Sequence, residues 1–178
     1  EQKLLLVDEN FFRFFNFKLV AGHPDSVLAG EGKVVVTESA ARRYFNYKGN
    51  GDSTPIGKTL NLAQGYIGRV TGIAEDPPLN SHLHFTLLLS LSSFTNTEPG
   101  DFMTNRIYTY FKLKPGTDID AVFNNFNKII EYKIGAELEQ VHNTTLANFK
   151  AQGNDIAFFT QPLLDIHLKS KLIDELEP

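Results

Sequence analysis

Short apolar runs separated by polar breaks predict a series of short strands and helices in the first part of the chain. Residues 4–7 are continuously apolar and suit a strand, and the three valines at 34–36 favour a buried strand. Thr37 follows as a helix N-cap, with Glu38 in the first turn, where the helix dipole favours a carboxylate. Apolar residues at helical spacing then continue to Phe45. This pattern predicts a strand that leads directly into a short helix.

The next apolar positions alternate with polar ones and predict a β-hairpin. Leu60 and Leu62 mark one half-buried strand, residues 67–73 mark its partner, and Gln64-Gly65 forms the turn. After a pair of prolines, residues 83–87 alternate again and predict a further strand.

A dense aromatic block lies between the first two predicted strands. Residues 11–17 contain five phenylalanines, and a turn capped by Asp8 or Asn10 places their rings on nearly every face. Large apolar side chains usually lie in the interior, so we expect core packing. The alternative is an aromatic patch that faces a ligand.

The second half of the chain begins after residues 92–103, which lack periodicity and predict a linker or long loop. Residues 107–113 carry a strong strand pattern. Apolar positions then keep the i, i+3, i+4, i+7 rhythm of an amphipathic helix from Ile119 to at least Ile134. Residues 137–150 predict a continuation of that helix or a second one, and residues 156–159 predict a new strand.

These elements predict an α+β fold with two subdomains. Residues 1–95 form a mixed, β-rich lobe, and residues 104–178 form a strand-helix-strand lobe of split βαβ type. We expect partner elements of the second lobe to precede residue 1, and this lobe to be incomplete at its N-terminal side.

Composition excludes several classes of function. The chain has 178 residues, of which 42% are hydrophobic and 21% charged, as in a soluble globular protein. A net charge of -4 without clustered Lys and Arg argues against nucleic-acid binding. Cysteine is absent, so disulfides, thiolate metal sites and a cysteine nucleophile are excluded. We also expect no transmembrane helix and no signal peptide in this stretch, which resembles a soluble piece excised from a larger protein.

Candidates for chemistry are few. His82 and His84 share a face of a predicted strand and would bind a metal only if a carboxylate such as Asp76 approached them. His167 and Asp165 resemble a dyad, but no serine in a nucleophile context accompanies them.

The remaining signals favour structural roles. Capping and solvation explain the acidic side chains, namely Asp8, Glu9, Glu38, Glu75 and Asp76. The sequence Pro55-Ile56-Gly57-Lys58-Thr59 lacks the glycine spacing of a phosphate-binding loop and predicts a turn that enters a strand. We therefore predict no catalytic, cofactor-binding or metal-binding residues, no cofactor and no enzymatic activity.

Several motifs in a fixed order resemble one known family. They are Val7-Asp8 with Phe11, Phe12, Phe15, Phe17 and Gly22; Val34 to Ser39 with Ala41, Tyr44 and Phe45; Pro55-Ile56-Gly57-Lys58; Val70-Thr71-Gly72-Ile73 with Asp76 and Pro77; Asn80-Ser81-His82; Tyr110-Phe111 with Leu113; and Gln161 to Leu168. Together they resemble the MacB-like periplasmic core domain of ABC transporter permeases of the FtsX and MacB type, especially its Bacteroidetes branch. The resemblance covers nearly the whole chain, although the loop at residues 46–52 looks longer than usual.

The resemblance implies a mechanical function for a periplasmic domain of a bacterial inner-membrane protein. Such a domain relays ATP-driven motion of membrane helices to a periplasmic substrate or partner. The implied partners are a cytoplasmic ATPase subunit, reached through transmembrane helices outside this sequence, a second permease copy, and an envelope partner or substrate. The resemblance also places the 104–178 lobe nearer the membrane. The alternative is a stand-alone periplasmic module that binds a ligand or a lipoprotein.

Overall fold

The computed structural model describes residues 3–49, 53–62, 65–94, 107–154 and 160–169 of the chain. The chain divides into two units. The described residues up to 94 belong to the first unit and those from 107 to 169 to the second.

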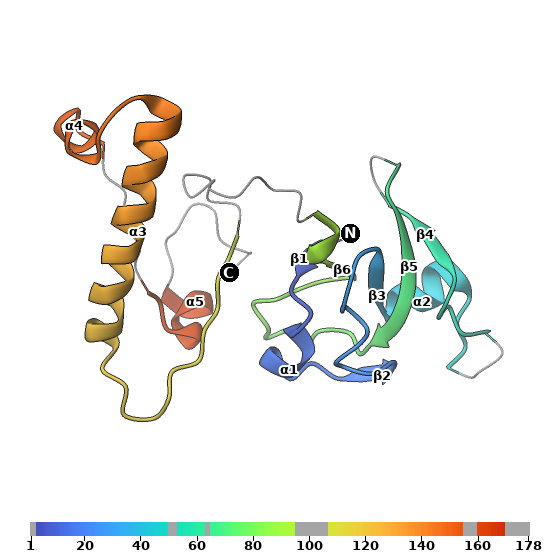
Figure 1. Ribbon diagram of the computed structural model, residues 1–178. Coiled ribbons are helices and arrows are strands. Elements are labelled where there is room, and N and C mark those ends of the chain that lie inside the picture. Colours follow the sequence, from blue (N-terminus) through green and yellow to red (C-terminus); the bar gives the residue numbers. More distant parts are fainter. Residues whose placement is uncertain (1–2, 50–52, 63–64, 95–106, 155–159, 170–178) are drawn as a thin grey trace. The chain divides into compact units, whose positions relative to one another are not determined.

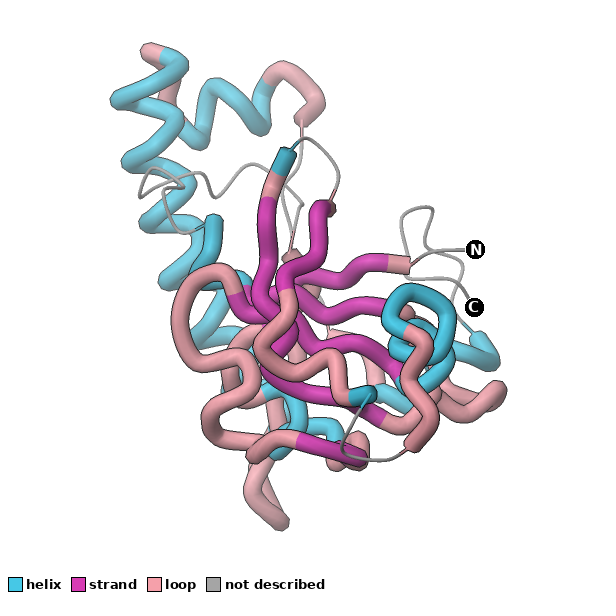
Figure 2. The backbone as a smooth tube through the Cα atoms, turned by 90° about the vertical axis from the view of Figure 1, so that its right-hand side faces the viewer, coloured by secondary structure: helices cyan, strands magenta, loops and turns pink. Residues whose placement is uncertain are grey.

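A six-stranded mixed sheet forms the centre of the first unit (Figures 1 and 2). The strand order is β1-β6-β3-β5-β2, and β4 also pairs with β5. β3 runs parallel to β5 and antiparallel to β6, β1 runs parallel to β6, and both β2 and β4 run antiparallel to β5. The strands are β1 (Leu4–Val7), β2 (Leu19–Ala21), β3 (Lys33–Thr37), β4 (Thr59–Asn61), β5 (Ile67–Ala74) and β6 (Leu87–Ser90).

Two helices bury the two faces of this sheet. Successive strand residues point to opposite faces, so the central strands contribute to two cores. On one face, Val35 and Leu88 cluster with residues of α1 (Phe11–Phe15). On the other face, Val34 and Val36 cluster with residues of α2 (Glu38–Phe45). Because both faces are covered, β3 and β6 are continuously apolar at these positions and do not alternate with polar residues.

A bulge between β3 and β5 fixes the loop that precedes β3. Val34 pairs with Val70 and Val35 pairs with Gly72, which leaves Thr71 as the extra residue. The Thr71 hydroxyl donates to the carbonyl oxygens of Val27 and Val34, at 2.5 and 3.1 Å. The bulge therefore ties this loop to the middle of the sheet.

Most predicted elements of the first unit are confirmed. The strands at 4–7 and 34–36, the helix that follows Thr37 and the antiparallel hairpin at 60–73 are all present. The mixed sheet with its helices confirms the α+β class. The strand predicted at 83–87 is wrong in its position, because β6 begins at Leu87 and continues to Ser90. The alternation at 83–87 comes from a loop in which Leu83 and Phe85 are buried.

The second unit is built on one long helix. α3 (Ile119–His142) begins at Asp118, whose carboxylate accepts the backbone N–H groups of Asp120 and Ala121 at 3.0 and 3.2 Å. The predicted amphipathic helix is confirmed and continues beyond Ile134. α4 (Leu146–Ala151) follows, capped by Thr145, so residues 137–150 include both the end of α3 and a second helix. α5 (Leu163–Lys169) is the last described helix.

The strand predicted at residues 107–113 is wrong, since this segment belongs to no strand or helix. A strand needs a neighbour for its backbone hydrogen bonds, and no described strand pairs with it. Most of its large side chains are exposed, with Ile107 at 70% and Phe111 at 51%. The strand predicted at 156–159 lies outside the described residues.

Candidate functional site

The aromatic block is a core and not a ligand-facing patch. Phe11 and Phe12 are buried, at 4% and 3% exposure. The Phe11 ring stacks on Phe17 with centroids 5.5 Å apart and meets the edge of Phe85 at 5.7 Å. Phe15 completes the group, 5.1 Å from Phe11. Stacked and edge-to-face ring contacts of this kind stabilise a core beyond the effect of apolar burial alone. The prediction of core packing is confirmed.

The proposed histidine pair does not lie on a strand. His82 and His84 lie in the loop that precedes β6, so the shared strand face on which the metal hypothesis depended is absent. The His82 ring meets the edge of Phe15 at 6.4 Å. Within the described residues, no group of three or more His, Cys, Asp or Glu side chains is placed to hold a metal ion.

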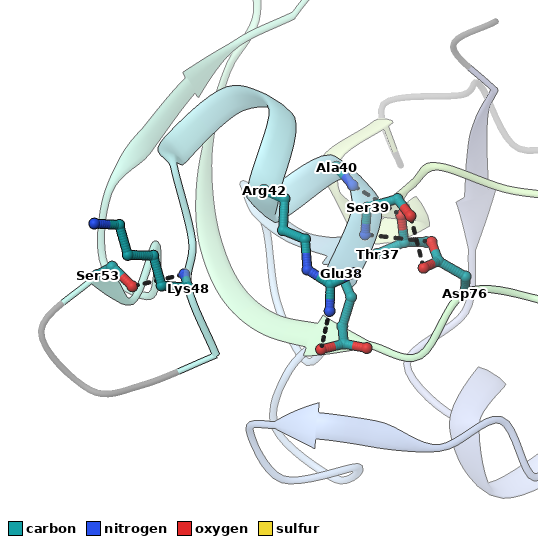
Figure 3. A network of polar contacts seen from close by, with 8 residues as sticks. All are labelled: Thr37, Glu38, Ser39, Ala40, Arg42, Lys48, Ser53 and Asp76. Atoms are coloured by element: carbon teal, nitrogen blue, oxygen red, sulfur yellow. Dashed lines mark hydrogen bonds and ion pairs between the residues drawn. The ribbon is translucent and has the colours of Figure 1, made fainter.

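Asp76, the carboxylate that would have completed that site, binds the start of α2 instead (Figure 3). The Ser39 hydroxyl donates to one oxygen of Asp76 at 2.7 Å, and the Ser39 backbone N–H donates to the other at 3.4 Å. Thr37 accepts the backbone N–H of Ala40 at 3.3 Å. Two backbone N–H groups in the first turn of α2 therefore have acceptors. The Thr37 cap accepts one of them, and the carboxylate of Asp76, which follows β5, accepts the other.

Further polar contacts in Figure 3 support the same helix and the loop after it. Glu38 pairs with Arg42 one turn later at 3.2 Å, an exposed i,i+4 pair that contributes a few tenths of a kcal/mol. The Ser53 hydroxyl accepts the backbone N–H of Lys48 at 2.9 Å. The predicted structural roles of Glu38 and Asp76 are thus confirmed. The sequence did not indicate the Ser39 to Asp76 contact, because 37 positions separate the two residues.

The remaining acidic candidates lie at exposed positions or in the first turn of a helix. Asp8, Glu9 and Glu75 are exposed. Asp165 lies in the first turn of α5, where a carboxylate suits the helix dipole. The side chain of His167 lies outside the described part of the structure.

The Pro55 to Thr59 segment is the predicted turn into a strand. The backbone N–H of Gly57 donates to the Val70 carbonyl at 2.8 Å, and Gly57 has a φ of +87° that favours glycine. The Lys58 ammonium lies 5.9 Å from the centre of the Phe45 ring, a cation–π contact. This lysine therefore packs on α2, at the edge of the core that lies on the α2 face of the sheet.

In the segments that the structure describes, no helix is both long and apolar enough to cross a bilayer. The first unit is a mixed α/β body whose described polar contacts mainly secure its own elements.

The chain belongs to the family of MacB-like periplasmic core domains, whose model matches residues 2–129. This family supplies the periplasmic domains of ABC transporter permeases, so the expected resemblance is confirmed. Among curated proteins, no relative matches the chain.

The solved structures that are similar to this chain include two from bacterial membrane proteins. One is a crystal structure of a domain of a protein assigned as a permease from Porphyromonas gingivalis, with 23% identity and a TM-score of 0.50. The match covers 78% of this chain and 58% of that structure. The other is the periplasmic region of MacB from Actinobacillus actinomycetemcomitans, with 20% identity, a TM-score of 0.45, and coverage of 86% and 66%. At this identity the Porphyromonas structure supports the fold alone.

Proposed function

We propose that this domain relays ATP-driven motion of the membrane helices of a permease to a substrate or partner in the periplasm. It carries out this relay without catalysing a reaction itself. The family match over residues 2–129 carries the proposal, because it identifies the domain with the extracytoplasmic part of such permeases.

The packing of the first unit suits such a relay. A body that transmits displacement must move as a whole, and densely packed interiors transmit strain because their compressibility is low. Here both faces of one sheet are buried, and all the buried hydrophobic residues in the described chain except Ile134 and Leu138 belong to this unit.

The organisation of the domain follows from the same proposal. Residues 1–95 form the lobe that meets the periplasmic partner, and residues 104–178 form the lobe nearer the membrane. The inner-membrane partners are a cytoplasmic ATPase subunit, reached through transmembrane helices, and a second permease copy. Neither a metal nor a cofactor takes part.

The test uses the full-length protein and its ATPase subunit. The gene should encode hydrophobic spans on both sides of this sequence, and the protein should fractionate with the inner membrane. This chain has no cysteine, so single spin labels at Glu9 in the two copies would report motion of the first unit. We expect the distance between the labels to change on ATP binding, and not when the ATPase subunit carries an inactivated nucleotide site.

Two results would contradict the proposal. A gene without flanking spans would favour the stand-alone periplasmic module that binds a ligand or a lipoprotein. Specific hydrolase activity of the purified domain that is lost in His82→Ala or His167→Ala would show that the domain is an enzyme.

A further inference from the structure

One leucine of the first unit projects almost completely into solvent. Leu79 is 95% exposed, the largest value among the exposed large hydrophobic side chains of the described residues. The other such side chains of this unit range from 39% for Ile56 to 62% for Ile67. Those residues keep about half of their surface against the protein, whereas Leu79 has almost no packing within it.

The backbone that carries Leu79 is held in place. The Ser81 backbone N–H donates to the Pro78 carbonyl at 3.0 Å and closes a turn with Leu79 and Asn80 at its tip. Two prolines precede the tip and restrict its φ angles. The Ser81 hydroxyl is also bonded to the backbone of Leu83, as donor to its carbonyl and acceptor from its N–H.

The other end of the turn is equally well anchored. Asp76 binds Ser39 at the start of α2, and the Glu75 backbone N–H donates to the Lys18 carbonyl at 3.0 Å. A pre-ordered turn loses little backbone conformational freedom on binding, so burial of the side chain that it carries contributes more of its free energy to affinity.

The charges beside the turn indicate the chemistry of the partner. Glu75 is exposed, and no ion pair of the described residues includes it or Asp76, although the backbone of Lys18 lies beside Glu75. Asp76 meets only neutral donors of Ser39. A negatively charged membrane surface would repel these carboxylates, and one leucine gives little membrane affinity.

We propose that the turn at residues 78–81 is a docking point for a partner protein, in which Leu79 fills an apolar pocket bordered by Lys or Arg side chains. This inference rests on the proposed function, since a relay requires a periplasmic partner. It adds which part of the domain makes the contact and what kind of pocket receives it.

The experiment begins with the full-length protein in the cells that encode it. A photo-crosslinking residue replaces Leu79 or, as a matched control, Leu164, which is a leucine of α5 with 83% exposure. The protein captured at position 79 is purified, and its affinity for the full-length permease is measured for the unmodified chain and for Leu79→Ala, Leu164→Ala and Glu75→Gln. Vesicles of phosphatidylethanolamine and phosphatidylglycerol form a parallel arm.

We expect Leu79→Ala to weaken binding by about tenfold or more, because a buried leucine side chain is lost from the pocket. Leu164→Ala should change the affinity less than twofold, and Glu75→Gln should weaken it only at low ionic strength. Thermal unfolding should be unchanged in all three variants, since these side chains are exposed.

Three results would overturn the inference. They are crosslinking at position 79 no stronger than at 164, equal affinity of Leu79→Ala and the unmodified chain, and binding to the vesicles that depends on Leu79. None of them depends on label motion or flanking spans, so the proposed function is judged separately.

Discussion

The two units bury their apolar side chains to very different extents. In the first unit, a sheet covered on both faces holds Leu28, Val34 and Leu88 at 0% exposure. In the second, only Ile134 and Leu138 are buried among the described residues, while Phe126 and Ile129 on the same helix are 44% and 59% exposed. The first unit therefore has a core of its own, whereas the helical unit leaves much of its apolar surface in water.

This difference shows that amphipathic periodicity and burial are separate properties. The pattern from Ile119 onward is as regular as any in the chain and does produce a helix. A stripe of apolar residues specifies the face that is suited to burial, but a neighbouring element must cover it. The following predictions test how far the stability of the chain depends on the first unit.

The largest loss of stability is expected for Leu88→Ala. Leu88 belongs to the core on the α1 face of the sheet and is 0% exposed. Its truncation should lower the free energy of unfolding by about 2–5 kcal/mol. The chain has no tryptophan, so far-UV circular dichroism in urea is the suitable measurement. Hydrogen exchange should rise throughout the first unit, and an effect confined to α3 would contradict the comparison.

A smaller loss of stability is expected for Gly22→Ala. This substitution tests how closely the loop that contains Val27 and precedes β3 packs on the bulge between β3 and β5. Gly22 has a φ of +103°, and an added Cβ would lie 2.5 Å from Val27 Cγ1 and 3.1 Å from the Thr71 carbonyl oxygen. Strain and displacement of the loop should cost about 1–3 kcal/mol. Gly49→Ala provides the control, because it also has a positive φ but no atom within 4 Å of the added Cβ. Equal melting temperatures for the two variants would show that the loop adapts.

A loss of about 1 kcal/mol is expected for Thr37→Ala, because the side chain that caps α2 is removed. Ser39→Ala should have a smaller effect on stability, because the backbone N–H at this position still donates to Asp76 after the hydroxyl is removed. The two variants share the first turn of α2, so the double variant should deviate from additivity in urea unfolding. Strict additivity would argue against a joint role for Thr37 and Asp76.

The smallest effect is expected for Ile129→Ser, which changes an exposed position of α3. Because Ile129 is 59% exposed, the loss in unfolding free energy should stay within about 0.5 kcal/mol. Ile134→Ser is the matched contrast on the buried side of the same helix. If both substitutions destabilised the chain equally, the exposed side of α3 would be covered in solution.

Local signals predicted much of the first unit. The valines at 34–36 and Thr37 specify their own strand and cap, because β-branching and N-capping act within a few residues. The pattern at 83–87 misled the prediction, since a loop with Leu83 and Phe85 turned inward shows the same alternation as a half-buried strand. The structure of residues 107–113 depends on a pairing partner, which no local pattern supplies.

The sequence predicted the role of the acidic side chains but not their partners. Residue types alone indicated that the carboxylates cap helices or face solvent, and Glu38 and Asp76 have such structural roles at the start of α2. The partner of Asp76 was not predictable, because the fold brings the end of β5 to the start of α2. The exposure of Leu79 was equally hidden, since a leucine after two prolines suits a core position as well as a turn tip.

The parallel pairing of β1 with β6 has a mechanical consequence. Leu4 pairs with Leu87 and Val7 with Ser90, so the start of β1 and the end of β6 lie at opposite ends of one ladder. A pull along the strands between these two ends would load the hydrogen bonds of the ladder in shear, all together, whereas an antiparallel pair pulled at neighbouring ends opens one bond at a time. One edge strand of the first unit is thereby joined to its sheet in the arrangement that best resists tension.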